Sequence, residues 1–210
     1  MKLTSNTTHL VIGTALVASC LILIVPLSAR SDKPVRFPVF TTSAGSKIPC
    51  GHCAAPSQMD SKAQIAPEKE PGERLVISGT IYRADGRTPA FDIVLFAYQT
   101  DTTGYYNKED DAFNPRLRGW VKTDKNGHYE FRTIRPGAYP HRNTPGHIHV
   151  HLYGPAITEH SIEEYRFADD PRLSRNEREE AQSKGRYSPV VAVTRRSDGT
   201  WEGVRDIKLP

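Results

Sequence analysis

Seven short runs rich in β-branched and aromatic residues fill the last two thirds of the chain, and no helical segments alternate with them. The runs cover residues 75–82, 93–98, 119–123, 128–133, 146–153, 190–194 and 201–207. Turn signals such as Lys125-Asn126-Gly127 and Ser197-Asp198-Gly199 separate neighbouring runs. This pattern predicts an all-β fold, an antiparallel β-sandwich. The charged stretch 157–184 has only weak helical periodicity, so we expect a loop with a short helix outside the core.

The sequence divides into a leader, a linker and one domain. In residues 1–29, Lys2 is the only charge and an apolar run begins at Leu10, which predicts a signal peptide or an uncleaved membrane anchor. Export to the periplasm or the outside of the cell follows. Residues 30–71 are rich in Pro, Ser, Lys and Ala and are typical of a linker. Residues 72–210 have the length of one ordinary domain.

Cysteine usage agrees with an exported protein. The linker holds Cys50 and Cys53 in a Cys-x-x-Cys arrangement, and the leader holds Cys20. Outside the cytoplasm, a local disulfide is the plain interpretation of such a pair. A redox dithiol and a metal-binding pair are the alternatives. Val17-Ala18-Ser19-Cys20 also resembles a lipid-attachment box, although the residues after Cys20 are apolar.

The charge balance argues against one class of partner. Lys and Arg number 28 and Asp and Glu 24, a net charge of +4 spread along the whole sequence. Proteins that bind nucleic acid usually gather their basic residues on one face or helix, so we expect no nucleic-acid partner. The surplus is compatible with a small anionic ligand. A homodimer is compatible with the sequence too, but no heptad or apolar patch specifies one.

Three histidines recur at every second position in Gly146-His147-Ile148-His149-Val150-His151. On a strand all three project to one face, about 6.6 Å apart from one to the next. Two imidazoles at this spacing can converge on one metal ion, whereas the third lies too far along the strand. Histidine is the commonest metal ligand. A solvated polar face is the equally simple alternative.

Further motifs accompany the histidines. Tyr105-Tyr106 follows the turn at Gly104, a Thr-Asp-x-x-Gly-x-Tyr-x-Phe-x-Thr-Ile stretch begins at Thr123, and Tyr139-Pro140 precedes Pro145-Gly146-His147. Together with His-x-His, these residues resemble the intradiol ring-cleavage dioxygenases, the family of catechol and protocatechuate dioxygenases. The likeness is detailed from Gly79 to Pro155.

The resemblance implies a non-haem Fe(III) centre with four protein ligands: Tyr106, Tyr139, His147 and His149. It implies an oxidoreductase that uses O2 to open a catechol-like ring between its two hydroxylated carbons. Tyr106 is favoured over Tyr105 because the family's first ligand stands two places after the turn glycine. Tyr139 corresponds to the ligand that leaves the metal and takes a substrate proton. His151 matches no ligand of the family.

The chemistry of these side chains agrees with that ligand set. A phenol has a pKa near 10 and binds well only when a strongly Lewis-acidic cation displaces its proton, and hard anionic oxygen suits Fe(III). One position departs from the family pattern: Thr144 stands where the resemblance implies an arginine. Either Arg142 or Arg135 supplies that charge from another direction, with Arg142 the nearer candidate for a catalytic role, or the chemistry is slower, altered or directed at another phenol.

Two other functions remain open at this point. The turn motif around Asp124 and Gly127 also occurs in prealbumin-like modules, where it merely builds a hairpin. The sandwich is therefore expected to be prealbumin-like under both interpretations, and one alternative is a non-catalytic binding or structural module. The other is an exported protein that binds copper or zinc through His147, His149 and His151.

Overall fold

The computed structural model describes residues 39–41, 47–49, 55–155 and 157–210, all within one compact unit, Val35–Pro210. Its strands are β1 (Val39–Thr41), β2 (Lys47–Pro49), β3 (Lys62–Gln64), β4 (Arg74–Tyr82), β5 (Val94–Gln99), β6 (Leu117–Lys122), β7 (His128–Ile134), β8 (His147–Gly154), β9 (Ile157–Ser161), β10 (Tyr165–Phe167), β11 (Val190–Val191), β12 (Val193–Arg195), β13 (Trp201–Val204) and β14 (Ile207–Lys208). One α-helix, α1 (Arg175–Lys184), and a 3₁₀ turn, η1 (Gly185–Tyr187), are also present.

Two predictions fall outside this part of the chain. The leader 1–29 and the pair Cys50 and Cys53 are not among the described residues. Within the described ranges, no helix has both the length and the apolar character needed to cross a membrane.

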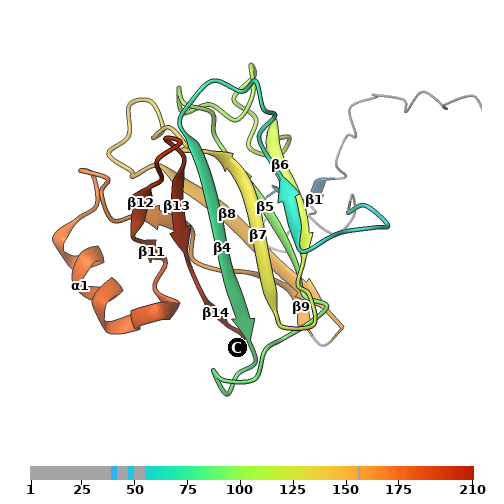
Figure 1. The fold of residues 1–210 in the computed structure, drawn as a ribbon. Helices are drawn as coiled ribbons and strands as arrows, with labels where there is room; N and C mark the ends of the chain where they lie inside the picture. The colour runs from blue at the N-terminus through green and yellow to red at the C-terminus, as the bar shows by residue number, and fades with distance from the viewer. Residues whose placement is uncertain (1–38, 42–46, 50–54, 156) are drawn as a thin grey trace, which may run out of the picture. The chain divides into compact units, whose positions relative to one another are not determined.

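Two 6-stranded sheets pack face to face, as Figure 1 shows. One has the order β12-β13-β4-β7-β3, with β14 pairing with β4. The other has the order β11-β10-β8-β5-β6, with β9 pairing with β8. Strands β1 and β2 form a separate antiparallel pair. The all-β sandwich is therefore confirmed as the class of fold.

Every second residue of the long strands fills the space between the sheets. From β4, Leu75 and Ile77 point inward, and from β8, Ile148 and Val150 do the same; all four are at most 1% exposed. Because side chains alternate between the two faces of a strand, the three histidines of β8 lie on the outer face of their sheet.

The prediction of a purely antiparallel sandwich is wrong for four of the strand pairs. The central pairs β4·β7, β5·β6 and β5·β8 are antiparallel. In contrast, β13 and β14 run parallel to β4, β3 runs parallel to β7, and β11 runs parallel to β10. Parallel neighbours need a long crossover connection, and each of these pairs joins segments far apart in the chain. Between β10 and β11 the connection contains α1.

The prediction that the stretch 157–184 lies outside the core is only half right. Helix α1 forms where the helical periodicity is weakly visible, begins with a capping box between Ser174 and Glu177, and buries none of its residues. However, β9 and β10 extend the sheet of β8, and Tyr165 and Phe167 are at most 1% exposed. Strands this short, with charged residues between the buried ones, show too few periods to be detected in sequence.

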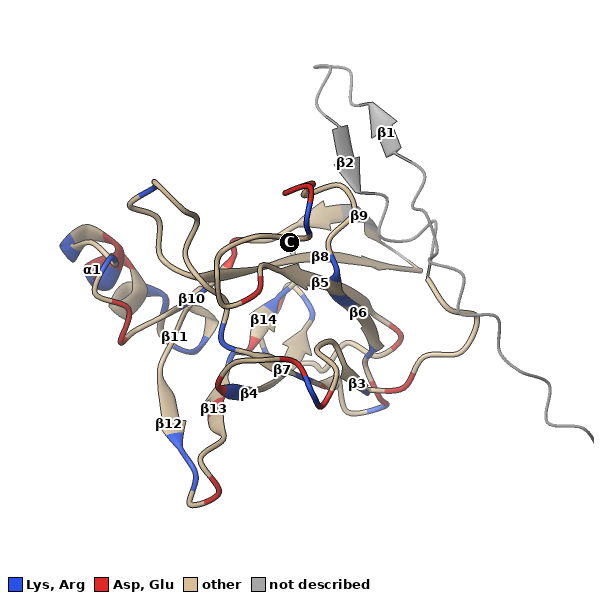
Figure 2. Cartoon of the chain, turned by 90° about the horizontal axis from the view of Figure 1, so that it is seen from above, with Lys and Arg blue, Asp and Glu red and all other residues tan. Residues whose placement is uncertain are grey.

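The charged residues are mixed in sign over the molecule. In Figure 2, Lys and Arg are interspersed with Asp and Glu along α1 and around the sandwich.

The predicted linker 30–71 also needs a correction at its C-terminal end. Strand β3 pairs with β7, and Ile65 and Ala66 belong to the main hydrophobic core, at 5% and 0% exposure. Glu70 is buried as well. The folded unit therefore begins before residue 72, and the segment 62–70, here called the N-terminal arm, is part of it. A single buried Ile-Ala pair among polar residues gives no periodicity, so the sequence of this segment resembles that of a linker.

If the N-terminal arm is packed as the structure shows, substitutions in it should change the free energy of unfolding, whereas substitutions in a linker should not. Ile65→Ala removes a buried side chain, so we expect the free energy of unfolding to fall by about 2–5 kcal/mol. Lys69→Ala, in the same arm but exposed, is the matched control and should change it by less than about 0.5 kcal/mol. Chemical denaturation of both variants measures the difference. Equal stabilities would mean that the arm is not packed in solution.

Candidate metal centre

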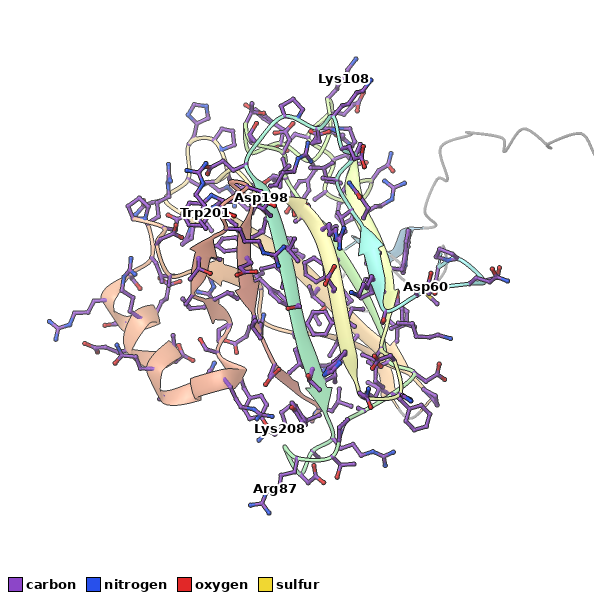
Figure 3. All side chains as sticks on the ribbon, in the orientation of Figure 1. Asp60, Arg87, Lys108, Asp198, Trp201 and Lys208 are labelled. Carbon is purple, nitrogen blue, oxygen red and sulfur yellow. The ribbon has the colours of Figure 1, made fainter. Side chains whose placement is uncertain are left out.

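Two loops and one strand end meet at the same end of the sandwich. Because β5 and β8 pair antiparallel, Gln99 at the end of β5 lies opposite Ile148 near the start of β8. The loop 100–116 leaves β5 at this point, and the loop 135–146 leads into β8. Both loops lie at the upper end of the view in Figure 1, where Figure 3 labels Lys108.

Four polar side chains converge at this end: Tyr106 from the first loop, Tyr139 from the second, and His147 and His149 from β8. The two tyrosine hydroxyls are hydrogen-bonded to each other. Nε2 of His149 lies 2.9 Å from the Tyr106 hydroxyl and 3.2 Å from the Tyr139 hydroxyl. Nε2 of His147 lies 3.1 Å from the Tyr139 hydroxyl and 3.1 Å from Nε2 of His149. The structure thus brings together all four residues that the sequence suggested as metal ligands, and we call them the Tyr-His cluster.

Both imidazoles turn Nε2 toward the centre of the cluster. Nδ1 of His147 donates a hydrogen bond to the Pro145 carbonyl at 2.8 Å, which leaves the lone pair on Nε2. Burial lowers the pKa of His149 to about 3, with smaller effects from His147 and His151. His149 is therefore neutral at physiological pH, as a metal ligand must be.

Both phenols are protonated in the metal-free protein. Burial raises the pKa of Tyr106 far above its ordinary value, and the hydrogen bond to Tyr139 adds to the effect. Burial also raises the pKa of Tyr139. Only a cation of high charge placed between these oxygens would displace their protons at neutral pH.

The two tyrosine loops are tied to each other by backbone hydrogen bonds. The carbonyl of Asp101 accepts from the N–H of Gly104 at 3.1 Å and from the N–H of Gly137 at 2.8 Å. The N–H of Arg116 donates to the Tyr106 carbonyl at 2.9 Å. The Arg116 guanidinium in turn pairs with the Glu70 carboxylate at 2.8 Å, so the N-terminal arm braces the loop that carries Tyr106.

Neighbouring candidates lie outside the cluster. Tyr105 is 40% exposed, whereas Tyr106 is 5% exposed. His151 faces the same side of β8, but its Nδ1 lies 3.1 Å from the Ser161 hydroxyl and its ring stacks against Tyr98. Among the described residues, no group of three His, Cys, Asp or Glu side chains could hold a metal ion. The copper or zinc site made of three histidines is therefore not favoured.

A pocket of about 350 Å³ opens beside the cluster. It is lined by Tyr105, Tyr106, Asp110, Ala112, Tyr139, Pro140, His141 and Arg142. The Arg142 guanidinium lies 5.8 Å from the centre of the Tyr139 ring. Arg135, the other candidate cation, instead forms two 2.7 Å hydrogen bonds with Asp169. Arg142 is thus the arginine that faces the pocket.

Two residues next to the cluster were missed at the level of sequence. Tyr98 lies opposite His149 in the β5·β8 register, and the two rings stack with centroids 4.7 Å apart. Glu164 places Oε1 3.9 Å from Nδ1 of His149. Tyr98 lies on β5 and Glu164 directly precedes β10, so only the register of these strands against β8 could have revealed the two contacts.

Comparison with known proteins agrees with this arrangement. A family model described as Dioxygenase matches residues 48–200. The chain belongs to the intradiol ring-cleavage dioxygenase family. The resemblance on which the sequence prediction rested is confirmed, and the non-catalytic module is not favoured.

Curated relatives carry dioxygenase names. The protocatechuate 3,4-dioxygenase beta chain of Burkholderia cepacia is 31% identical over 146 residues, which cover 64% of this chain and 54% of the relative. Catechol 1,2-dioxygenase 1 of Acinetobacter lwoffii is 34% identical over 110 residues, which cover 42% of this chain and 34% of the relative. The matched part therefore spans about half or less of these relatives.

Solved structures of the family share the sandwich. The dioxygenase domain of a dioxygenase and carbohydrate-binding fusion protein from Streptomyces sp. SirexAA-E superimposes with a TM-score of 0.54 at 27% identity, covering 74% of this chain and 97% of that domain. Catechol 1,2-dioxygenase from Acinetobacter sp. ADP1 gives a TM-score of 0.58 at 23% identity, covering 74% and 58%. The second comparison shows a common fold.

In this member of the intradiol dioxygenase family, Gly104 allows the two tyrosine loops to touch. It has φ +87°, and a Cβ built on it would lie 2.1 Å from the Ala138 carbonyl oxygen. Gly199 has the same φ, but a Cβ there would meet nothing closer than 3.9 Å. Gly199→Ala should therefore lower the free energy of unfolding by only about 1–2 kcal/mol, the cost of holding a residue with a Cβ at positive φ. Gly104→Ala should cost about 1–3 kcal/mol more, because the loops must separate.

Chemical denaturation of the two glycine variants tests this expectation. The difference between them isolates the steric contact from the shared backbone conformation. Equal losses of stability would show that the two tyrosine loops are not in contact at Gly104.

Proposed function

We propose that this protein is a non-haem Fe(III) intradiol dioxygenase that uses O2 to cleave a catechol-type ring between its two hydroxylated carbons. The observation that carries the proposal is the convergence of two phenol oxygens and two imidazole nitrogens in the Tyr-His cluster. The names of the curated relatives agree with this reaction. The same leader that predicts export makes a periplasmic or secreted enzyme, anchored or free, part of the proposal.

The cluster fits ferric iron by its chemistry. Its donors are two neutral imidazoles and two phenols whose protons must be displaced, and hard anionic oxygen favours a hard trivalent cation over a soft one. Tyr106, Tyr139, His147 and His149 would hold the ion. When bound, Fe(III) supplies the Lewis acidity and electron-accepting capacity that intradiol cleavage requires.

The two tyrosines differ in a way that assigns them different roles. Tyr106 is buried, whereas Tyr139 is half-buried, lines the pocket and carries Arg142 over its ring. Tyr139 is thus the phenolate that an incoming catechol can reach, and it accepts a proton from the substrate hydroxyl. Tyr106 stays in place because the backbone of Arg116 holds its loop.

Arg142 supplies the positive charge that the resemblance places at position 144, where this chain has threonine. Its guanidinium faces the pocket from the loop 135–146, and Arg135 is occupied by Asp169. A cation beside the ring stabilises negative charge that develops on the substrate as it loses its protons. Arg142 therefore acts on the substrate and not on the metal.

Replacing single tyrosines tests the ligand assignment. Tyr106→Phe should lower iron retention, because a buried anionic ligand is lost. Tyr139→Phe should retain more iron than Tyr106→Phe does. Its rate of ring cleavage should fall by about 10²–10⁴-fold, because the proton acceptor is gone. Tyr105→Phe is the matched control for iron retention. Iron content, the visible absorption of ferric tyrosinate, and oxygen uptake with catechol, protocatechuate and hydroxyquinol are the measurements.

Three outcomes would contradict the proposal. Iron retained in Tyr106→Phe but lost in Tyr105→Phe would overturn the assignment of the first ligand. Unchanged turnover in Tyr139→Phe would overturn its role as proton acceptor. A colourless wild-type protein with stoichiometric zinc would favour the other metals, and a folded protein that takes up no metal would favour a binding module.

The role of Arg142 has its own test. Arg142→Gln should reduce kcat/KM by about 10²-fold and leave iron content unchanged, because the charge acts on the substrate. Arg175→Gln on α1, whose side chain is 89% exposed, is the matched control and should behave as the wild type. A fall in iron content in Arg142→Gln would show that the arginine supports the metal site instead.

A further inference from the structure

His149 is flanked by a side chain from each neighbouring strand. On one side, β5 places Tyr98 opposite His149. On the other side, β10 pairs antiparallel with β8 so that Tyr165 lies opposite Ile148 and Arg166 opposite His147. Continuing this register by one residue places Glu164 opposite His149. Residues opposite one another project to the same face of a sheet, so the three form a row across β5, β8 and β10, which Figure 2 shows side by side.

The contacts within the row are specific. The Tyr98 ring stacks on the His149 ring with centroids 4.7 Å apart and an interplanar angle of 18°. On the far side, Oε1 of Glu164 lies 3.9 Å from Nδ1 of His149. The other histidine of the cluster is held differently, because Nδ1 of His147 is bound by the backbone carbonyl of Pro145. Nδ1 of His149 instead has the Glu164 carboxylate as its neighbour.

A carboxylate at this place has a definite effect on the imidazole. It favours the proton on Nδ1, which leaves the lone pair of Nε2 directed at the tyrosine hydroxyls. The 3.9 Å separation is too long for a direct hydrogen bond, so the interaction acts through charge or through one bridging water. A nearby negative charge also makes Nε2 of the imidazole a stronger electron-pair donor toward a metal ion.

We propose that Glu164 is a positioning residue for His149, with Tyr98 as the stacking surface, and that this row sets the donor strength of the imidazole toward a metal. This inference rests on the proposed function, since it concerns the same site. It assigns no contact between Glu164 and the substrate.

The test compares Glu164→Gln and Glu164→Leu with Glu163→Gln. Glu163 is the adjacent carboxylate of similar exposure, but it pairs with Lys184 at 2.7 Å. Glu164→Leu should lower iron affinity, measured by competition with a chelator, by about 10–100-fold. Glu164→Gln should lower it less, because a neutral amide oxygen still accepts a hydrogen bond. The visible band should move to lower energy in the same order, and Glu163→Gln should match the wild type.

A second measurement needs no metal. Nitrogen-15 NMR of the metal-free protein should find His149 protonated on Nδ1 in the wild type and a mixture of tautomers in Glu164→Leu, with His147 as the internal reference. Unchanged iron affinity, band energy and tautomer in Glu164→Leu would overturn the inference. If the wild type itself takes up no iron, the proposed function fails, and the tautomer of His149 still decides the role of Glu164.

Discussion

The antiparallel pairing of β5 with β8 is the constraint on which the Tyr-His cluster depends. It brings the end of one strand to the start of the other, so the loops that carry Tyr106 and Tyr139 emerge beside His147. The register is held by burial of Ile148 and Val150 in the core. A slip of one residue would turn the histidines into the core and expose the aliphatic side chains. The free energy lost with that apolar burial disfavours such a slip.

The cluster itself is held together by mutual hydrogen bonding of groups that would be costly to bury alone. Two phenols and two imidazoles satisfy one another at 2.9–3.2 Å or closer, and the surrounding burial keeps the phenols protonated and His149 neutral. The same desolvation favours binding of a multivalent cation, because one ion between the four side chains replaces all of their mutual contacts at once. Preorganisation of the loops by their shared backbone hydrogen bonds keeps this spacing.

The N-terminal arm links the folding of the sandwich to the site. Ile65 and Ala66 fill the core beneath β7, and Glu70, a few residues further on, holds Arg116, whose backbone binds the Tyr106 carbonyl. The arm thus connects the hydrophobic core to one tyrosine through the ion pair between the buried Glu70 carboxylate and the partly exposed Arg116 guanidinium. A segment that carries no site residue of its own therefore contributes to the geometry of the site.

The sequence alone predicted seven strand-forming runs and a row of histidines on one strand face, because alternation along a strand is a local property of the chain. Two of those runs, 190–194 and 201–207, each hold two strands in the structure. The four residues of the cluster were indicated by the resemblance to a known family, whose motifs are also local. The short strands β9 and β10, the arm around Ile65 and the parallel strand pairs could not be predicted in this way, since they depend on partners distant in sequence. The same holds for Tyr98 and Glu164. Only the tertiary structure decided which side chains flank His149, because strand register depends on how the two sheets pack and not on any one segment.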